Sequence, residues 1–137
     1  MKNIFILGFV FMLLVSCSIN DDSDSYVLEI LPVESVDMPD EFVLGQTYPI
    51  TVYYYRPTTC HTFRNFYYVK DNNIRTVAPI TYVFENHNNC SDLADDLVEA
   101  TFNFIVTSNG SYIFKFWQGE NIDGEDQYLT IEVPVMD

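Results

Sequence analysis

The sequence predicts an all-β domain, an antiparallel β-sandwich of about seven strands, and three observations support this. Short runs rich in Val, Ile, Thr, Tyr and Phe recur from residue 26 onward, separated by Gly, Pro, Asn or Asp. No long stretch repeats its apolar residues with helical spacing. Aromatic residues make up 16% and hydrophobic residues 48% of the 137 residues, which favours one packed core. The predicted strands are 26–31, 48–56, 63–69, 74–84, 98–106, 111–117 and 128–133.

The first four strands follow from local composition and alternation. The strand 26–31 begins where an acidic, serine-rich stretch becomes apolar. In 48–56, the side chains of Ile50, Val52 and Tyr54 are expected to face the core, because alternate residues of a strand share one face. The strand 63–69 is rich in Phe and Tyr. The strand 74–84 contains Pro79, which cannot donate to a ladder, so we expect this strand at a sheet edge or broken in two.

The strands 98–106 and 111–117 are predicted to form a hairpin. A three-residue loop, 108–110, with Gly110 in a left-handed conformation gives one wholly apolar face. The pairs would be Val106 with Tyr112, Phe104 with Phe114, and Phe102 with Phe116. An acidic turn then leads to the last strand, 128–133, and 91–97 is the one segment expected to form a turn or two of helix.

The segment from Val36 through Phe42 and Gly45 into Ile50 and Val52 resembles the opening of immunoglobulin-like sandwich domains, where a loop leads into a central strand. The resemblance implies an immunoglobulin-like sandwich over 26–137. The buried tryptophan and inter-sheet cysteine pair of antibody-type domains are not matched, since Trp117 lies in a late predicted strand.

The first residues carry an export pattern. Lys2 precedes an apolar run from Ile4 to Val15, which is shorter than the roughly 20 residues that span a bilayer. The run ends in Leu-Val-Ser-Cys at 14–17, which resembles the lipobox of bacterial lipoproteins, whose cysteine is acylated and becomes the N-terminus. The resemblance implies a signal peptide over 1–16, a lipidated Cys17 and attachment to a membrane through this lipid.

The stretch after Cys17 is acidic. Asp21, Asp22 and Asp24 lie in 17–25, which has almost no apolar residues and is expected to form a solvated tether. The same acidic patch also resembles the surface-export signal of Bacteroidota-type lipoproteins, and the two interpretations stay open. We expect a lipid-anchored protein of the outer membrane, facing either the periplasm or the cell surface.

The charge of the chain limits its partners. Without residues 1–16, 121 residues remain with 5 basic and 20 acidic side chains, a balance of −15. Such a surface repels nucleic acid and anionic lipid headgroups, which counts against both as partners. For a protein anchored in the envelope, other envelope proteins or a polysaccharide are the expected partner classes.

Cys60 and Cys90 remain after Cys17 is assigned to the lipid, and an exported pair predicts a disulfide. A zinc site is the alternative, because His61 adjoins Cys60 and His87 lies three residues before Cys90. Neighbouring residues of an extended chain point to opposite faces, and no metal-binding spacing is present, so the disulfide is favoured.

No catalytic signature is found. The chain has no G-x-S-x-G, no H-E-x-x-H and no phosphate-binding glycine loop. The acidic loop 119–126 lacks the first and twelfth ligands of an EF-hand when aligned by Gly124, so a solvated turn is favoured over a calcium site. We expect no enzyme, no metal and no cofactor; an enzyme with an unrecognised carboxylate site is the rival interpretation.

Tyr53, Tyr55, Tyr67 and Trp117 fall on the outward phase of their predicted strands. An exposed aromatic row could stack on sugar rings, whereas cross-strand packing within the sheet is the simpler explanation. The leading functional hypothesis is therefore a non-catalytic interaction or structural module of the cell envelope, and the alternative is a carbohydrate-binding accessory lipoprotein.

Overall fold

The computed structural model describes residues 25–85 and 89–137, and this part of the chain is all β. The seven predicted strands are confirmed, with ends that differ by up to three residues, and three short strands are added to them. The predicted signal peptide, Cys17 and most of the tether lie outside the described residues. The strands are β1 (Tyr26–Ile30), β2 (Ser35–Asp37), β3 (Phe42–Val43), β4 (Thr47–Tyr55), β5 (His61–Asp71), β6 (Ile74–Phe84), β7 (Leu97–Ile105), β8 (Tyr112–Glu120), β9 (Asp126–Val133) and β10 (Val135–Met136).

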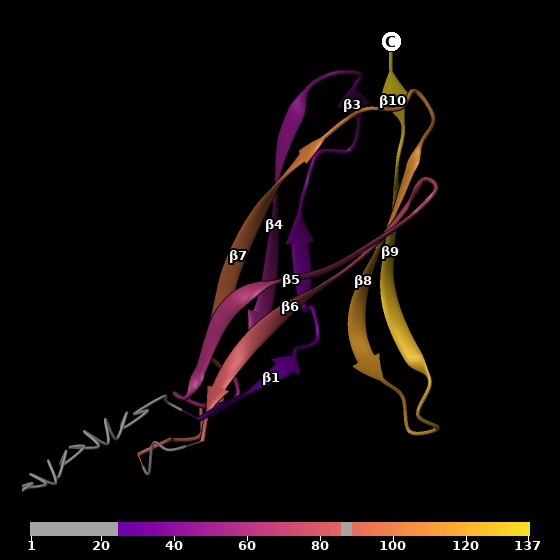
Figure 1. The fold of residues 1–137 in the computed structure, drawn as a ribbon. Coiled ribbons are helices and arrows are strands. Elements are labelled where there is room, and N and C mark those ends of the chain that lie inside the picture. Colours follow the sequence, from indigo (N-terminus) through magenta and orange to yellow (C-terminus); the bar gives the residue numbers. More distant parts are fainter. Residues whose placement is uncertain (1–24, 86–88) are drawn as a thin grey trace, which may run out of the picture.

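Two larger sheets pack face to face as a β-sandwich (Figure 1), and β3 and β10 form a third, two-stranded sheet. One is three-stranded, in the order β2-β4-β7, and the other is five-stranded, with β6 paired to β1, β5 and β8, and β8 paired to β9. The core lies between them and is dominated by aromatic and β-branched side chains. Its fully buried members include Phe42, Ile50, Val52, Val77, Phe114, Phe116 and Val133.

The predicted hairpin between 98–106 and 111–117 is wrong. β7 pairs with β4, whereas β8 pairs with β6 and β9 in the other sheet. The apolar faces of β7 and β8 therefore meet across the core: the ring of Phe104 lies 4.9 Å from Tyr112 and 5.1 Å from Phe114. Gly110 also lacks the positive φ predicted for it. The alternation of apolar and polar residues shows which side chains of a strand point inward. It does not show whether two such strands pair within one sheet or lie in opposite sheets across the core.

The expectation for Pro79 is also wrong, because β6 is continuous and lies in the middle of its sheet. β6 pairs with β8 up to Val77 and with β1 from Ile80, so Pro79 lies where the partner changes. The Pro79 carbonyl accepts from the Leu31 N–H on this side at 3.0 Å. Since the N–H and C=O of one strand residue point the same way, the missing N–H of Pro79 faces the gap between β1 and β8.

Two strand pairs are parallel, in contrast to the wholly antiparallel sandwich predicted. β6 pairs with β8 and β10 with β3 in this way. The connection from β6 to β8 passes through β7 in the opposite sheet, and a crossover of this kind is what brings two strands together in parallel.

The short helix predicted over 91–97 is absent from the described chain, because this segment bonds to residues 56–59 instead. Thr59 donates its N–H to the Ser91 carbonyl at 3.0 Å, and Leu93 donates to Pro57 at 2.9 Å. A bridge between Thr58 and Asp92 lies between these bonds. The segment is therefore non-helical, bends at residues 94 and 95, and is held to the connection between β4 and β5.

Candidate functional site

The structure separates the four predicted binding residues into two pairs. Tyr53 and Tyr55 lie on the outer face of the three-stranded sheet, whereas Tyr67 in β5 and Trp117 in β8 lie on the outer face of the five-stranded sheet. Tyr53 is opposite Glu99 of β7, and burial followed by the charges of Glu99 and Asp37 raises its pKa. The aromatic residues therefore do not form one row.

Tyr67 and Trp117 are two walls of one trough. β5, β6 and β8 are neighbouring strands; Tyr67 is opposite Ala78, and Trp117 lies one residue beyond the last register pair, Val77 with Phe116. Strand spacing places the two aromatic residues about 10 Å apart at the backbone, with Ala78 between them. Since Ala78 has only a methyl group and is 1% exposed, it forms a floor between two taller rings.

The trough has a volume of about 250 Å³, and polar groups lie beside its aromatic walls. Thr76 and Asp126 line it together with Ile30. The Trp117 Nε1–H donates to Asp126 Oδ1 at 2.8 Å, which fixes the indole and leaves the carboxylate further acceptor sites.

Tyr128 extends this aromatic surface beyond Trp117, which it faces across the β8–β9 pair. Burial, then the charge of Asp126 and the proximity of Tyr67, raises the pKa of the Tyr128 hydroxyl. The Lys115 ammonium lies over the Tyr128 ring, 4.2 Å from its centre. We call Tyr67, Ala78, Trp117, Asp126 and Tyr128 the outer aromatic site.

Sequence reasoning identified only Tyr67 and Trp117 of this site. Ala78, Asp126 and Tyr128 were missed because their membership depends on which strands are neighbours. The available signal was weak: an alanine on the outward phase of an aromatic-rich sheet, and an acidic residue just before the last strand.

Cys60 and Cys90 form the predicted disulfide, with their Cα atoms 5.4 Å apart. The bond joins the start of β5 to the segment before β7, which reinforces the backbone bonds between 56–59 and 91–96. The zinc alternative is thereby overturned for these two thiols, since a disulfide removes the thiolates that zinc requires. His87 lies outside the described residues.

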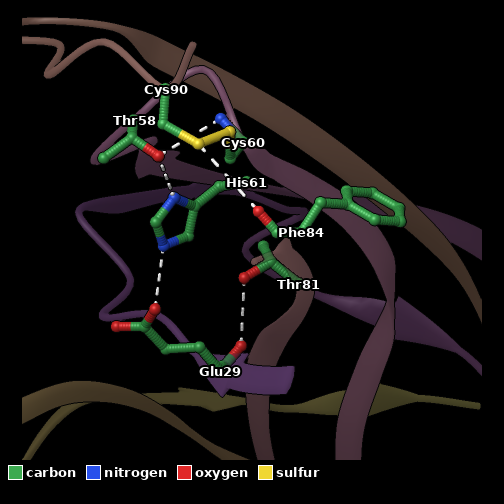
Figure 2. Close-up of polar contacts among 7 residues, drawn as sticks. All are labelled: Glu29, Thr58, Cys60, His61, Thr81, Phe84 and Cys90. Atoms are coloured by element: carbon green, nitrogen blue, oxygen red, sulfur yellow. Dashed lines mark hydrogen bonds and ion pairs between the residues drawn. A yellow bond between two sulfur atoms is a disulfide. The ribbon is translucent and has the colours of Figure 1, made fainter. Parts of the chain in front are cut away.

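His61 is the buried middle member of a polar chain, Thr58–His61–Glu29, that the sequence did not reveal; Thr58 is half-buried and Glu29 is exposed (Figure 2). Its ring, in a residue only 5% exposed, lies between Thr58 Oγ1 at Nδ1 and Glu29 Oε2 at Nε2, both at 2.8 Å. Both ring nitrogens of His61 therefore have a hydrogen-bond partner, a hydroxyl on one side and a carboxylate on the other. Thr58 Oγ1 also accepts the Cys60 N–H at 3.2 Å.

The acidic turn 119–126 is organised by an amide. Asn121 Oδ1 accepts the backbone N–H groups of Asp123 and Glu125, each at 2.9 Å. Within residues 25–85 and 89–137, no three His, Cys, Asp or Glu side chains gather in a metal-binding group.

Comparison with known protein families, curated proteins and solved structures found no match. In the described ranges no helix has the length and apolar character needed to cross a membrane.

Proposed function

We propose that this protein is a lipid-anchored, non-catalytic binding module of the bacterial cell envelope, and that its ligand is a carbohydrate. The observation that carries the proposal is the trough between Tyr67 and Trp117, with Ala78 as its floor and Asp126 beside it.

Sugar chemistry fits this arrangement. The apolar C–H face of a pyranose packs against an aromatic ring, and its hydroxyl groups donate to carboxylate oxygens. Trp117 and Tyr67 supply rings on two sides, and Asp126 supplies the acceptor. Because the indole is already fixed by Asp126, little side-chain freedom is lost on binding.

The Thr58–His61–Glu29 chain resembles the order of groups in a hydrolytic triad, but its contacts favour a structural role. The Thr58 hydroxyl oxygen accepts the Cys60 N–H at 3.2 Å, and the imidazole is buried within the disulfide region. Its two ring bonds join β1 to the β4–β5 connection. We therefore infer that these three side chains hold β1 in position and are not a catalytic triad.

Binding is tested by affinity gel electrophoresis and a glycan array with the full chain purified in detergent. We expect Trp117→Ala and Tyr67→Ala each to weaken retention by soluble polysaccharide about fivefold or more, by analogy with a base stacked on an aromatic ring, which contributes roughly 1 to 3 kcal/mol. Tyr55→Ala is the matched control, because Tyr55 is 44% exposed and Tyr67 42% exposed, but Tyr55 lies on the other sheet. Absence of binding to every glycan would refute the carbohydrate proposal.

Anchoring rests on the lipobox of residues 14–17 and is tested separately. Labelled palmitate should be incorporated into the chain and should be lost in Cys17→Ala. Replacement of Asp21, Asp22 and Asp24 by Ser should abolish protease accessibility on whole cells if these residues are an export signal, and leave it unchanged if they are only a tether.

A further inference from the structure

A second hollow, on the inner side of the five-stranded sheet, lies where the sandwich is open. This groove of about 500 Å³ runs between the tip of the β5–β6 hairpin and the edge strand β7. Alternate residues of β5 and consecutive residues of β7 line it, with Phe66, Tyr68 and Phe102 as its aromatic wall. The ring of Phe102 lies 5.0 Å from Phe66 and 5.8 Å from Tyr68.

The charges in this groove are opposite in sign to the rest of the protein. Lys70 and Arg75 line it, and none of its described lining residues is Asp or Glu, although the chain has 20 acidic and 6 basic residues. Lys70 and Arg75 are directly opposite each other in the β5–β6 register. Like charges at opposite positions destabilise a strand pair, so an anion placed between them would relieve a cost that the free protein carries.

Arg75 is the stronger indication of an anion. The residue is 4% exposed, and a buried Arg normally has an acidic partner. Its Nη1 instead donates to the carbonyls of Asn72 and Ile74, at 2.7 and 3.0 Å, and the guanidinium lies over the rings of Phe104 and Tyr112. Among the described residues, the carboxylate contacts of basic side chains are Arg56 with Asp96 and His61 with Glu29, and neither involves Arg75.

The backbone of β7 offers a second, independent feature. Val106 donates its N–H to Gln46 at 2.9 Å, on the β4 side, so by alternation Asn103 and Ile105 point their N–H and C=O groups away from β4. The register agrees, because Asn103 is opposite Pro49, which has no N–H to exchange. Both residues line the groove, and β7 has a neighbouring strand on one side only within the described chain.

We propose that this groove binds an extended peptide segment of a partner protein. The segment adds to β7 as an antiparallel strand, places alternate apolar side chains against Phe66 and Phe102, and sets an acidic residue between Lys70 and Arg75. Main-chain bonds to an exposed edge give affinity in this mode of recognition, and side-chain pockets give specificity. This site lies on the inner side of its sheet and is distinct from the outer aromatic site.

The acidic stretch of the chain itself cannot be this segment. Tyr26 pairs with Phe84, at the end of β6 remote from Arg75. Phe84 and Arg75 are nine residue steps apart along β6, about 30 Å, whereas the chain from Asp21 to Tyr26 extends at most about 17 Å.

The test uses the full chain in detergent and an acetylated, amidated peptide, Asp-Asp-Val-Thr-Phe-Thr-Val-Ser, measured by calorimetry. We expect binding that weakens with added salt and is lost when Lys-Lys replaces Asp-Asp. Two further peptides carry N-methyl groups on alternate residues: one on the odd-numbered residues and the other on the even-numbered residues. Only one phase presents its N–H groups to β7, so one of these peptides should bind and the other should not. Hydrogen exchange should slow at the amides of Asn103 and Ile105.

Lys70→Gln should weaken the acidic peptide about tenfold, as expected for loss of one charge-assisted contact. Arg64→Gln is the matched control, because it removes the same charge from a residue outside the groove and should leave affinity unchanged. Lys70 is exposed, so the test does not depend on substituting the buried Arg75. Absence of binding by the acidic peptide, equal binding of the two N-methylated peptides, or an unchanged Lys70→Gln affinity would overturn the proposal. Self-association that protects Asn103 and Ile105 without peptide would assign the groove to a second copy, and would also overturn it.

Discussion

Tyr54 packs with Leu31 and Ala100 in the smaller of the two core clusters, and it is 3% exposed. Burial raises the pKa of this tyrosine, and the charge of Arg56 opposes the shift only in part. The unfolded chain ionises near pH 10, whereas the folded chain keeps the proton to a higher pH. The stability contributed by the neutral hydroxyl is therefore complete below about pH 10 and is lost as the pH rises from there toward the folded pKa.

We predict from this that the free energy of unfolding falls more steeply above about pH 10 in the parent chain than in Tyr54→Phe. Urea unfolding between about pH 8 and pH 11 measures the difference. Tyr55→Phe is the control, since Tyr55 is 44% exposed and should leave the slope unchanged. Equal slopes for the parent and Tyr54→Phe would show that the Tyr54 hydroxyl does not govern alkaline stability.

At this scale the sequence predicted well which side chains face the core. Ile50, Val52 and Tyr54 are buried, and Tyr53 and Tyr55 face outward, as the alternation of β4 indicated. Arg75 was not foreseen, because its position in an apolar environment depends on contacts with Phe104 and Tyr112 from other strands. The local sequence around a charged residue does not show whether its side chain will be covered by residues from other strands.

At the scale of elements, all seven predicted strands are present, but their partners were predicted poorly. β7 and β8 illustrate the reason: both have inward apolar faces, and this is compatible with a hairpin or with strands in opposite sheets. The choice is made by β4 and β6, which lie far away in the sequence and offer better partners. Local patterns contain no information on such long-range competition.

Tyr112, the first residue of β8, bonds to the connection between β7 and β8, and this contact bears on the immunoglobulin-like resemblance. Its hydroxyl accepts the N–H groups of Thr107 and Ser108, at 3.2 and 3.0 Å, just upstream of β8. A tyrosine at the start of a late strand that bonds back to the preceding connection is similar to the tyrosine corner of immunoglobulin-like sandwiches. The parallel pair of β6 and β8 departs from the antiparallel sandwich that we predicted. The immunoglobulin-like assignment stays a prediction.

The corrected geometry of the β7–β8 connection makes a testable contrast between two glycines. Gly119 in β8 has φ +91°, and an added Cβ would lie 3.5 Å from Pro32 Cγ, whereas Gly110 has open space and no positive φ. We expect Gly119→Ala to lower the free energy of unfolding by about 1 to 2 kcal/mol, because L-residues are strained at positive φ. Gly110→Ala should leave stability unchanged or raise it by up to about 1 kcal/mol.

Denaturant unfolding of both variants measures this contrast. A loss of stability in Gly110→Ala equal to that in Gly119→Ala would support the left-handed hairpin loop predicted from the sequence and contradict the connection described here.

The disulfide secures the ends of two elements, β5 and the segment before β7. Its cysteines are 30 residues apart, and closing a loop of that length stabilises the folded state by about 3 to 4 kcal/mol in the chain-entropy model. We expect the double variant Cys60→Ser/Cys90→Ser to lose about this much free energy of unfolding, and reduction of the parent chain to produce the same loss. Reductant should not change the double variant. Two free thiols at positions 60 and 90 in the denatured, unreduced chain would contradict the bond.

At the scale of the whole molecule, the candidate sites arise from how the sheets are assembled. Tyr67 and Trp117 are 50 positions apart in the sequence and share a trough because β6 lies between β5 and β8. The groove beside β7 exists because β5 and β6 of one sheet and the edge strand β7 of the other supply its lining residues. The composition of the sequence shows many aromatic and acidic residues. It does not show which aromatic side chains lie together, or that Lys70 and Arg75 line the same groove.

The excess of negative charge over the whole molecule gives the last prediction. The chain has 20 Asp and Glu and 6 Lys and Arg, and carboxylates that repel one another oppose the compact state. Added salt screens this repulsion, with a Debye length of about 30 Å at 0.01 M and about 10 Å at 0.1 M. We expect the free energy of unfolding at neutral pH to rise by about 1 kcal/mol between these salt concentrations. The rise should shrink near pH 4, where many carboxylates are protonated. A fall with salt would instead show that ion pairs such as Arg56 with Asp96, at 2.7 Å, outweigh the repulsion.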